Sequence, residues 1–216
     1  HCFGEPPVRV HPVVWMGNAL DWAGKRVAPL AERAGVGRDL KSFWLAALYW
    51  IALSAITLVV AWGLQWAVLQ LPWWLAAIGL GLCLKPLLAW RMLRTEVQAV
   101  EAALGQSLAA GRERLSWLVS RDVTQLTEAQ VRESAIESLA ENLNDSVVAP
   151  LFWFAVAGLP GAALYRFANT ADAMWGYRTV RGGRQWEWAG KWAARADDVL
   201  NWLPARLTAL LLWPVG

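Results

Sequence analysis

The sequence has too little cysteine for a disulfide-linked or zinc-binding protein. Only two of its 216 residues are cysteines, Cys2 and Cys83, and Cys83 lies inside an apolar run. Two cysteines build neither a disulfide framework nor a four-cysteine zinc site. Any chemistry is therefore expected to rely on oxygen ligands and on acid–base groups.

The sequence is also poor in charge and lacks the usual nucleotide-binding loops. Charged residues make up 17% of the chain, the formal net charge is +3, and no run of five or six like charges occurs. Nucleic acid is therefore not expected as a partner. Neither a Gly-x-x-x-x-Gly-Lys-Ser/Thr loop nor a Gly-x-Gly-x-x-Gly loop is present, so a nucleotide would have to be held by side chains and metal.

Apolar residues, by contrast, are abundant. They form 57% of the chain, and many of its 17 tryptophans flank apolar runs, where amphipathic rings favour the headgroup level of a bilayer. We predict one all-α, membrane-embedded domain over residues 1–216. It should contain a transmembrane helical hairpin, a broken or re-entrant apolar segment, and polar helices at the membrane surface.

A long uncharged stretch predicts the hairpin. No residue between Lys41 and Lys85 is charged, which leaves room for two bilayer crossings of about 20 residues each. Proline disfavours helix at the preceding residue and suits the first position of a helix, so Leu71-Pro72 marks the turn. We expect helices over Phe43–Leu71 and Pro72–Trp90. Because basic residues flank both outer ends and the turn has none, both ends should face the cytoplasm.

The segment after this hairpin is polar and helical in period. Apolar residues recur on one helical face at Leu93, Val97, Val100 and Leu104. We interpret this stripe as a packing face. Gly105 and Gly111 bracket an expected break, and Thr127 with Gln130 forms a capping box that opens a helix over Glu128–Asn144.

The last internal apolar stretch is expected to be broken. Ser146–Tyr165 carries no charge, but Pro150 and the Leu159-Pro160-Gly161 segment interrupt it. Irregular backbone at membrane depth is tolerated only where it is packed in protein or lines a wet cavity. We therefore predict that the chain bends near Gly158 to Gly161 and returns.

A stripe of carboxylates is the first candidate site. One side of the predicted helix carries Glu133, Glu137, Glu141, Asn144 and Asp145. Like charges one turn apart destabilise a helix by roughly 0.2–0.5 kcal/mol per pair, and a bound cation would relieve this repulsion. A hard ion such as Mg²⁺ suits an all-oxygen set of ligands. The alternative interpretation is a solvated acidic face.

A second polar cluster lies further along the chain. It comprises Asn169, Asp172, Arg195, Asp197, Asp198, Asn201 and Arg206. On a helix, the oxygens of Asp197, Asp198 and Asn201 converge because these residues are three or four positions apart. The two arginines either neutralise the aspartates structurally or hold phosphate oxygens. His11, in a stiff proline-containing loop, is a candidate base or substrate contact, or a hydrogen-bonded loop residue.

Together these segments resemble the adenosylcobinamide-phosphate synthase family, known as CbiB or CobD. The resemblance rests on Gly4-Glu5-Pro6 with His11-Pro12-Val13, Ser120-Arg121-Asp122, Glu137 with Ala140-Glu141-Asn142 and Asp145, Asn169-Thr170 with Asp172 and Tyr177, and Arg195 with Asp197-Asp198, Asn201 and Pro204-Ala205-Arg206. These motifs cover nearly the whole chain in order. The resemblance implies that the chain is a fragment, without the first apolar segment and the C-terminal part of the family.

The resemblance implies an ATP- and Mg²⁺-dependent ligase of cobalamin biosynthesis. Its substrates would be adenosylcobyric acid, a corrinoid, and aminopropanol phosphate, and it would be a multi-pass protein of the inner membrane. Another copy of the chain, or other cobalamin-assembly enzymes, would be its protein partners. An acyl phosphate would activate the carboxylate before the amine attacks.

We assign the site residues on this basis. The catalytic carboxylates would be Glu137, Glu141, Asp145, Asp197 and Asp198. Metal ligands would be Glu141, Asp145, Asp172 and Asp198. Substrate or nucleotide would contact His11, Arg121, Asp122, Asn142, Asn169, Tyr177, Arg195, Asn201 and Arg206.

Two other function classes stay open at this point. A Mg²⁺-dependent membrane prenyltransferase also uses aspartate pairs, and it would turn over a prenyl diphosphate without ATP. A non-catalytic membrane sensor or assembly protein would tolerate loss of the acids, for example Asp198→Ala.

A single site constrains the topology. ATP is cytoplasmic, and one metal site cannot span about 30 Å of hydrocarbon. We therefore predict that both acidic clusters face one cytoplasmic cavity. The carboxyl groups of Asp145 and Asp198 should share a pocket of nucleotide size, roughly 15 Å across at most.

Overall fold

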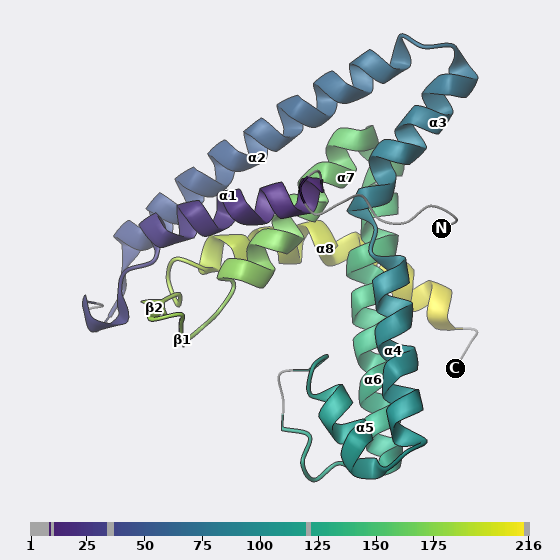
Figure 1. Ribbon diagram of the computed structural model, residues 1–216. Helices are drawn as coiled ribbons and strands as arrows, with labels where there is room; N and C mark the ends of the chain where they lie inside the picture. Colours follow the sequence, from purple (N-terminus) through teal and green to yellow (C-terminus); the bar gives the residue numbers. More distant parts are fainter. Residues whose placement is uncertain (1–8, 10, 34–36, 120–121, 214–216) are drawn as a thin grey trace.

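The protein is an assembly of helices with one very short β-hairpin. The computed structural model describes residues 9, 11–33, 37–119 and 122–213 (Figure 1). Its elements in chain order are α1 (Pro12–Val27), a 3₁₀ turn (Ala31–Arg33), α2 (Leu40–Leu69), α3 (Trp73–Leu84), a 3₁₀ turn (Lys85–Leu87), α4 (Trp90–Leu104), α5 (Leu108–Leu115), α6 (Glu128–Leu143), a π-turn (Asn144–Val148), α7 (Ala149–Trp175), β1 (Val180–Arg181), β2 (Arg184–Gln185) and α8 (Lys191–Leu212). The predicted all-helical class is confirmed.

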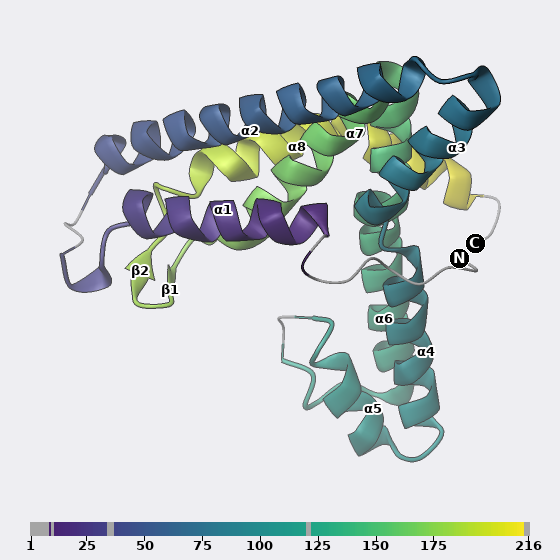
Figure 2. The same cartoon turned by 45° about the horizontal axis from the view of Figure 1, so that its top comes forward.

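Helices α2 and α3 form the predicted hairpin. Helix α2 begins at Asp39, whose side chain accepts a hydrogen bond from the backbone N–H of Ser42 at 3.0 Å. Helix α3 ends at Leu84, earlier than predicted, because Pro86 has no N–H to continue the helical ladder and a 3₁₀ turn follows instead. The two helices meet at their turn and diverge from it (Figures 1 and 2).

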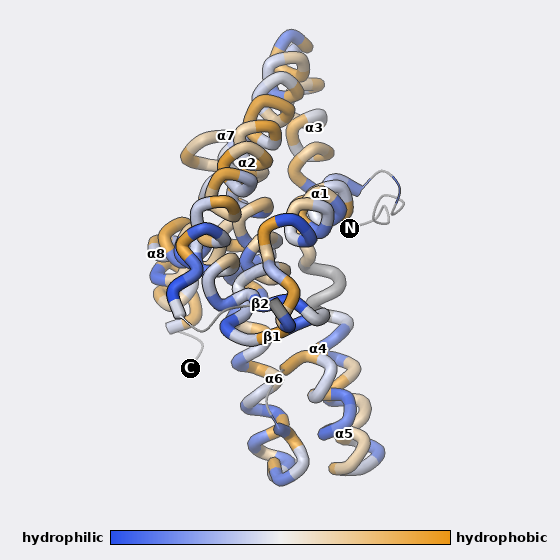
Figure 3. Tube along the Cα trace, turned by 90° about the vertical axis from the view of Figure 1, so that its left-hand side faces the viewer, coloured by the Kyte–Doolittle hydropathy of each residue, from blue (hydrophilic) through white to orange (hydrophobic). Residues whose placement is uncertain are grey.

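Two segments are long and apolar enough to cross a membrane. One is Leu40–Leu69 and the other is Glu128–Trp175, which combines α6, the π-turn and α7, with mean hydropathies of 2.1 and 1.9 over their most apolar stretches. Figure 3 shows α2 as largely hydrophobic, whereas α5 and α6 carry long hydrophilic stretches.

The polar helices α4, α5 and α6 pack into a unit of their own that extends away from the other helices (Figure 2). Its core contains Val100 and Leu104 of the predicted stripe, together with Leu115 and Val131. The capping box of Thr127 and Gln130 is present at the start of α6. The predicted break is shorter than expected, because Gly111 lies inside α5. A Cβ there would lie 2.3 Å from a methyl carbon of Leu104, so this glycine serves close packing.

Helix α7 is broken where the sequence predicted a bend. Ala157 and Gly158 leave helical geometry, and Gly158 has φ 65° and ψ −155°. The side chain Oε1 of Gln65 in α2 accepts a hydrogen bond from the backbone N–H of Leu159 at 2.7 Å, replacing a lost helical partner. The chain then doubles back, so that the second arm of α7 lies along α1, α2 and α8 (Figures 1 and 2).

A buried aromatic core fixes the second arm of α7 in place. Trp50 of α2, Phe167 and Trp175 of α7, and Leu20 of α1 belong to one apolar cluster. The indole N–H of Trp175 donates to the backbone oxygen of Leu20 at 3.1 Å. The first arm is held differently, since the indole of Trp153 donates to the backbone oxygen of Leu200 in α8 at 2.9 Å. Both arms therefore meet α8.

Candidate functional site

The site is built where α6 passes into α7 through the π-turn. A π-turn adds a residue to the helical repeat and is often found at functional sites. Here it turns Asn144 into the protein, where that residue is buried, and leaves Asp145 beside it half-buried. The two residues therefore face α8 and the second arm of α7 instead of continuing the solvent-facing stripe of α6.

Asp145 accepts hydrogen bonds from three elements. Its Oδ1 atom accepts from Nδ2 of Asn144 at 2.9 Å, from Nδ2 of Asn201 at 2.8 Å and from the hydroxyl of Tyr165 at 3.3 Å. Its Oδ2 atom accepts from Nδ2 of Asn169 at 3.2 Å. All four partners donate, so both carboxylate oxygens of Asp145 act as acceptors.

Three further aspartates gather around Asp145, and we call the four the aspartate cluster: Asp145, Asp172, Asp197 and Asp198. Asp197 is only 8% exposed. Burial, together with the charges of the other three aspartates, raises the pKa of Asp197 to about 7. The Oδ1 atom of Asp197 has no hydrogen-bond partner within the described part of the chain. The four carboxylates repel one another when ionised, and a cation would relieve that repulsion.

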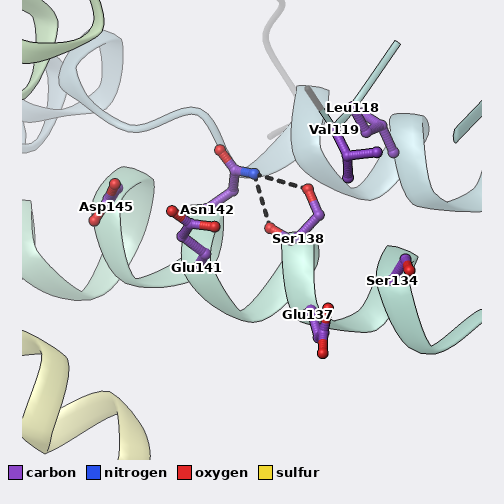
Figure 4. Close-up of a pocket in the computed structure, with 8 residues that line it drawn as sticks. All are labelled: Leu118, Val119, Ser134, Glu137, Ser138, Glu141, Asn142 and Asp145. Carbon is purple, nitrogen blue, oxygen red and sulfur yellow. Dashed lines mark hydrogen bonds between the residues drawn. The ribbon is translucent and has the colours of Figure 1, made fainter. Parts of the chain in front are cut away.

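Asp145 also lines an open groove along α6. This acidic groove has a volume of about 440 Å³ and is lined by Leu118, Val119, Ser134, Glu137, Ser138, Glu141, Asn142 and Asp145 (Figure 4). The amide of Asn142 points back to Ser138, donating to its backbone oxygen at 2.7 Å and to its hydroxyl at 3.2 Å. Asp145 thus links the groove to the aspartate cluster.

The two acidic segments predicted from the sequence meet here. Asn201 contacts Asp145 directly, and Asp198 lies one turn of α8 before Asn201. The predicted bend at Gly158 produces this meeting, because it returns Asn169 and Asp172 to the level of the π-turn. The two predicted segments are therefore in contact at Asp145, whereas the groove that Asp145 lines contains no residue of α8, so a pocket shared by Asp145 and Asp198 stays a prediction.

Other predicted contact residues lie outside this cluster. His11 caps the start of α1, and its Nδ1 atom is buried without a hydrogen-bond partner within the described chain. The Tyr177 hydroxyl donates to the backbone oxygen of Ala173 at 2.8 Å. Asp122 lies in the loop before α6, where the backbone N–H of Thr124 donates to it at 2.9 Å and lowers its pKa.

Two of the predicted arginines, Arg195 and Arg206, lie within the described residues, and both are exposed. Arg206 is exposed; its guanidinium lies 3.8 Å from the ring centre of Trp202 and donates to that residue's backbone oxygen at 2.7 Å. Arg195 is exposed on α8. Arg121 lies outside the described residues.

Comparison with known protein families matches residues 1–215 to the family described as CobD/Cbib protein. The chain belongs to the CobD/Cbib family. Its aspartate cluster and acidic groove are thus features of a CobD/Cbib protein.

Individual relatives agree with this assignment. The chain is 42% identical over 213 residues to the "Probable cobalamin biosynthesis protein CobD" of Pyrococcus abyssi, covering 99% of this chain and 67% of that protein. It is 42% identical over 214 residues to the "Cobalamin biosynthesis protein CobD" of Chromobacterium violaceum, covering 99% of this chain and 65% of that protein. The chain therefore spans about two thirds of the length of these relatives. No solved structure matches it.

The carboxylates of this CobD/Cbib chain suit a Mg²⁺ ion that is bound partly by the protein and partly by substrate phosphates and water. Within the described ranges, no three side chains of His, Cys, Asp or Glu are placed to hold one metal ion together. The predicted ligands Glu141, Asp145, Asp172 and Asp198 are therefore not a closed cage. Mg²⁺ commonly uses only one or two carboxylates, completed by water and by substrate phosphates. Glu141 and Asp145, which line one groove, fit that mode.

Three residues of the site were not among the sequence candidates. Tyr165 donates to Asp145, and Thr208 donates to the Oδ1 atom of Asn144 at 2.8 Å. Arg166 interacts electrostatically with Asp145, and its Nε atom is buried without a hydrogen-bond partner within the described chain. The sequence could have indicated Arg166, because this residue directly follows an uncharged stretch that must pack inward.

Proposed function

We propose that this chain carries the site of an adenosylcobinamide-phosphate synthase. The reaction is ATP- and Mg²⁺-dependent formation of an amide between adenosylcobyric acid and aminopropanol phosphate, within cobalamin biosynthesis. Membership of the CobD/Cbib family, whose relatives are named as cobalamin biosynthesis proteins, supports the pathway.

One observation supports a reaction that uses a phosphate ligand and its cation. Asp145 joins an acidic groove of about 440 Å³ to a cluster of four aspartates, although these residues come from three separate helical segments. Ligand pockets of small molecules are commonly about 300–1,000 Å³, so the groove is large enough for a nucleotide-sized ligand. Excess carboxylate beside such a groove supports binding of a phosphate ligand together with its counter-cation.

In the proposed reaction, an acyl phosphate forms first and the amide bond forms second. A substrate carboxylate oxygen attacks the terminal phosphorus of ATP, which releases ADP and leaves an acyl phosphate. The ammonium group of the second substrate first gives one proton to a neighbouring carboxylate. The neutral amine then attacks the acyl carbon, phosphate leaves with the former C–O bonding pair, and the second proton of the nitrogen leaves with that phosphate. When bound, Mg²⁺ supplies charge neutralisation for the phosphates.

The roles of the chain's own residues are to bind, orient and accept protons. Glu141 and Asp145 bind the cation of the nucleotide from the groove side. Asp198, exposed at the edge of the cluster, is available to accept the amine proton. Buried Tyr165 and half-buried Arg166 and Asn169 keep Asp145 in place.

We further propose that α2, α3 and the bend of α7 lie in the inner membrane and that the site faces the cytoplasm. Several large side chains of α2 are each more than 60% exposed: Trp44, Leu48, Val59, Val60 and Trp62. In water they would form an apolar patch of a size that soluble monomers rarely expose. The first arm of α7, residues 149–156, rises only about 12 Å, so it enters a bilayer of about 30 Å only part-way.

The decisive experiment uses the full-length protein purified in detergent. With adenosylcobyric acid, aminopropanol phosphate and MgATP, we expect adenosylcobinamide phosphate and ADP in equal amounts by mass spectrometry and coupled assay. Omission of ATP should stop the reaction. Turnover of a prenyl diphosphate without ATP would instead support a prenyltransferase.

A pair of variants separates catalysis from assembly. Asp198→Asn should lose activity, whereas Asp21→Asn should keep it, because Asp21 is an exposed residue of α1 paired with Lys25 at 2.6 Å. Equal activity of both variants would favour a non-catalytic role for the aspartate cluster.

A further inference from the structure

A chain of hydrogen bonds, buried at its Thr208 end and partly buried at Asp145, leads from Thr208 in α8 to Asp145. The hydroxyl of Thr208 donates to Oδ1 of Asn144 at 2.8 Å. Nδ2 of Asn144 donates to Oδ1 of Asn201 at 2.6 Å and to Oδ1 of Asp145 at 2.9 Å. Nδ2 of Asn201 completes the chain by donating to the same Asp145 oxygen at 2.8 Å. Thr208 and Asn144 are only 5% and 6% exposed.

The orientation of both amides follows from the two ends of this chain. An ionised carboxylate only accepts hydrogen bonds, so Asn144 and Asn201 must direct their N–H groups toward Asp145. The Oδ1 atom of Asn144 then faces α8, and a donor is needed there because an unpaired buried oxygen is costly. The hydroxyl of Thr208 is that donor, shared with the backbone oxygen of Pro204 at 3.0 Å.

The hydrogen-bond chain also gives the two carboxylate oxygens of Asp145 different numbers of donors. Oδ1 accepts three hydrogen bonds, from Asn144, Asn201 and Tyr165, whereas Oδ2 accepts one within the described residues, from Asn169 at 3.2 Å. A carboxylate oxygen with three donors has little capacity left for another ligand. Oδ2 is therefore the oxygen of Asp145 with capacity for a cation.

We infer that Thr208 and Asn144 are positioning residues that fix the Asn144 and Asn201 amides on Oδ1 of Asp145 and so leave Oδ2 for the cation of the substrate complex. The consequence for catalysis rests on the proposed function. It changes the role predicted for Asn201 from substrate contact to positioning. It also explains why the π-turn is needed, since that turn brings Asn144 and Asp145 to face α8 together.

The first test needs neither metal nor substrate. The full-length protein is labelled with ¹⁵N-asparagine in detergent, and hydrogen exchange of the side-chain amides is followed by NMR, with Asn144→Asp and Asn201→Asp used for assignment. The Asn144 and Asn201 amides of the wild type should exchange more slowly than the amide of Asn18, an exposed residue of α1. Exchange at the rate of Asn18 would overturn the inference without any variant of Thr208.

Substitution of Thr208 gives the second test. Thr208→Val keeps the shape of the side chain and removes the hydroxyl, so exchange at both amides should accelerate roughly tenfold. Thr208→Ser should restore wild-type rates. The matched control is Thr57→Val in α2, where the hydroxyl bonds only to the backbone oxygen of Leu53 at 2.9 Å, and exchange at Asn144 and Asn201 should not change.

Function is tested last. In Thr208→Val we expect the affinity for Mn²⁺, measured by electron paramagnetic resonance, and kcat each to fall roughly tenfold, with KM for the aminoalcohol phosphate unchanged. Unaltered exchange in Thr208→Val, or equal acceleration in Thr57→Val, would overturn the inference. If the wild type forms no amide in the presence of ATP, the proposed function fails. The exchange data still decide whether the hydrogen bonds from Thr208 to Asp145 hold the two amides in place.

Discussion

Asn201 donates its Nδ2 hydrogen to Oδ1 of Asp145 at 2.8 Å, across 56 positions of the sequence. This bond joins the acidic stripe of α6 to the aspartate-rich motif of α8. It depends on the reversal of α7 at Gly158, since a straight α7 would carry α8 away from the π-turn. The broken helix is therefore part of the site as well as of the fold.

The first prediction concerns the groove. Glu141→Gln should abolish amide formation, because it removes a charged oxygen from the groove proposed to hold the nucleotide's cation. Folding should change little, since Glu141 is exposed. Steady-state kinetics and thermal unfolding in detergent measure the two effects.

Glu133→Gln is the matched control for this change. Glu133 is exposed on the same helix but does not line the groove, so activity should be retained. Full activity of Glu141→Gln would remove the proposed metal role of the groove. Equal losses in both variants would point to the general charge of α6 instead.

Local signals in the sequence were sufficient for much of the fold. The uncharged stretch between Lys41 and Lys85 predicted the α2–α3 hairpin, and the Thr127–Gln130 pair predicted the start of α6. The proline and glycines near Gly158 predicted the bend. Each of these features depends on residues that are close in sequence, where propensity and hydrogen bonding act directly.

The parts of the site that were missed depend on tertiary contacts. Nothing in the residues Asn144–Val148 indicates a π-turn, which exists here because Asn144 finds partners on α8. Thr208 lies in an apolar run, where no neighbouring residue in the sequence indicates its bond to Asn144. Arg206 was expected at the site, but cation–π contact with Trp202 on its own helix holds it elsewhere.

The second prediction tests the bend of α7. Gly158 has φ 65°, and a Cβ there would lie 2.3 Å from Oε1 of Gln65. Gly158→Ala should therefore destabilise the protein by about 1–3 kcal/mol and lower activity, because the returning arm carries Asn169 and Asp172. Thermal unfolding and kinetics in detergent provide the measurement.

Gly63→Ala is the control, because this glycine lies inside α2 and an added Cβ meets no atom within 4 Å. It should be neutral or stabilising by about 0.5–1 kcal/mol. A Gly158→Ala protein as stable and active as wild type would show that the bend does not need a glycine.

The third prediction concerns topology. A cysteine at Leu71, in the turn between α2 and α3, should be labelled by a membrane-impermeant thiol reagent only from outside the cytoplasm, after Cys2 and Cys83 are replaced. A cysteine at Ser107, between α4 and α5, should be labelled only from the cytoplasmic side. Labelling of Leu71→Cys from the cytoplasm alone would reverse the proposed orientation of the hairpin.

The last prediction concerns the pH dependence of the α2 cap. The hydroxyl and backbone N–H of Ser42 both donate to Asp39, and these hydrogen bonds lower the pKa of Asp39 below its ordinary 3.8. At pH values between the ordinary and the lowered pKa, the unfolded chain binds more protons than the folded one. The stabilisation by the Asp39 carboxylate is therefore complete above pH 3.8 and is lost as the pH falls through the lowered pKa. Asp39→Ala should lower the free energy of unfolding by about 0.5–2 kcal/mol at about pH 7 and by less at about pH 3. Each kcal/mol lost should lower Tm by roughly 2–4 °C. Asp39→Asn still caps the helix but carries no charge, so it should lose less stability than Asp39→Ala at about pH 7 and little at about pH 3. A loss in Asp39→Ala that is equal at both pH values would show that the charge of Asp39 does not stabilise α2.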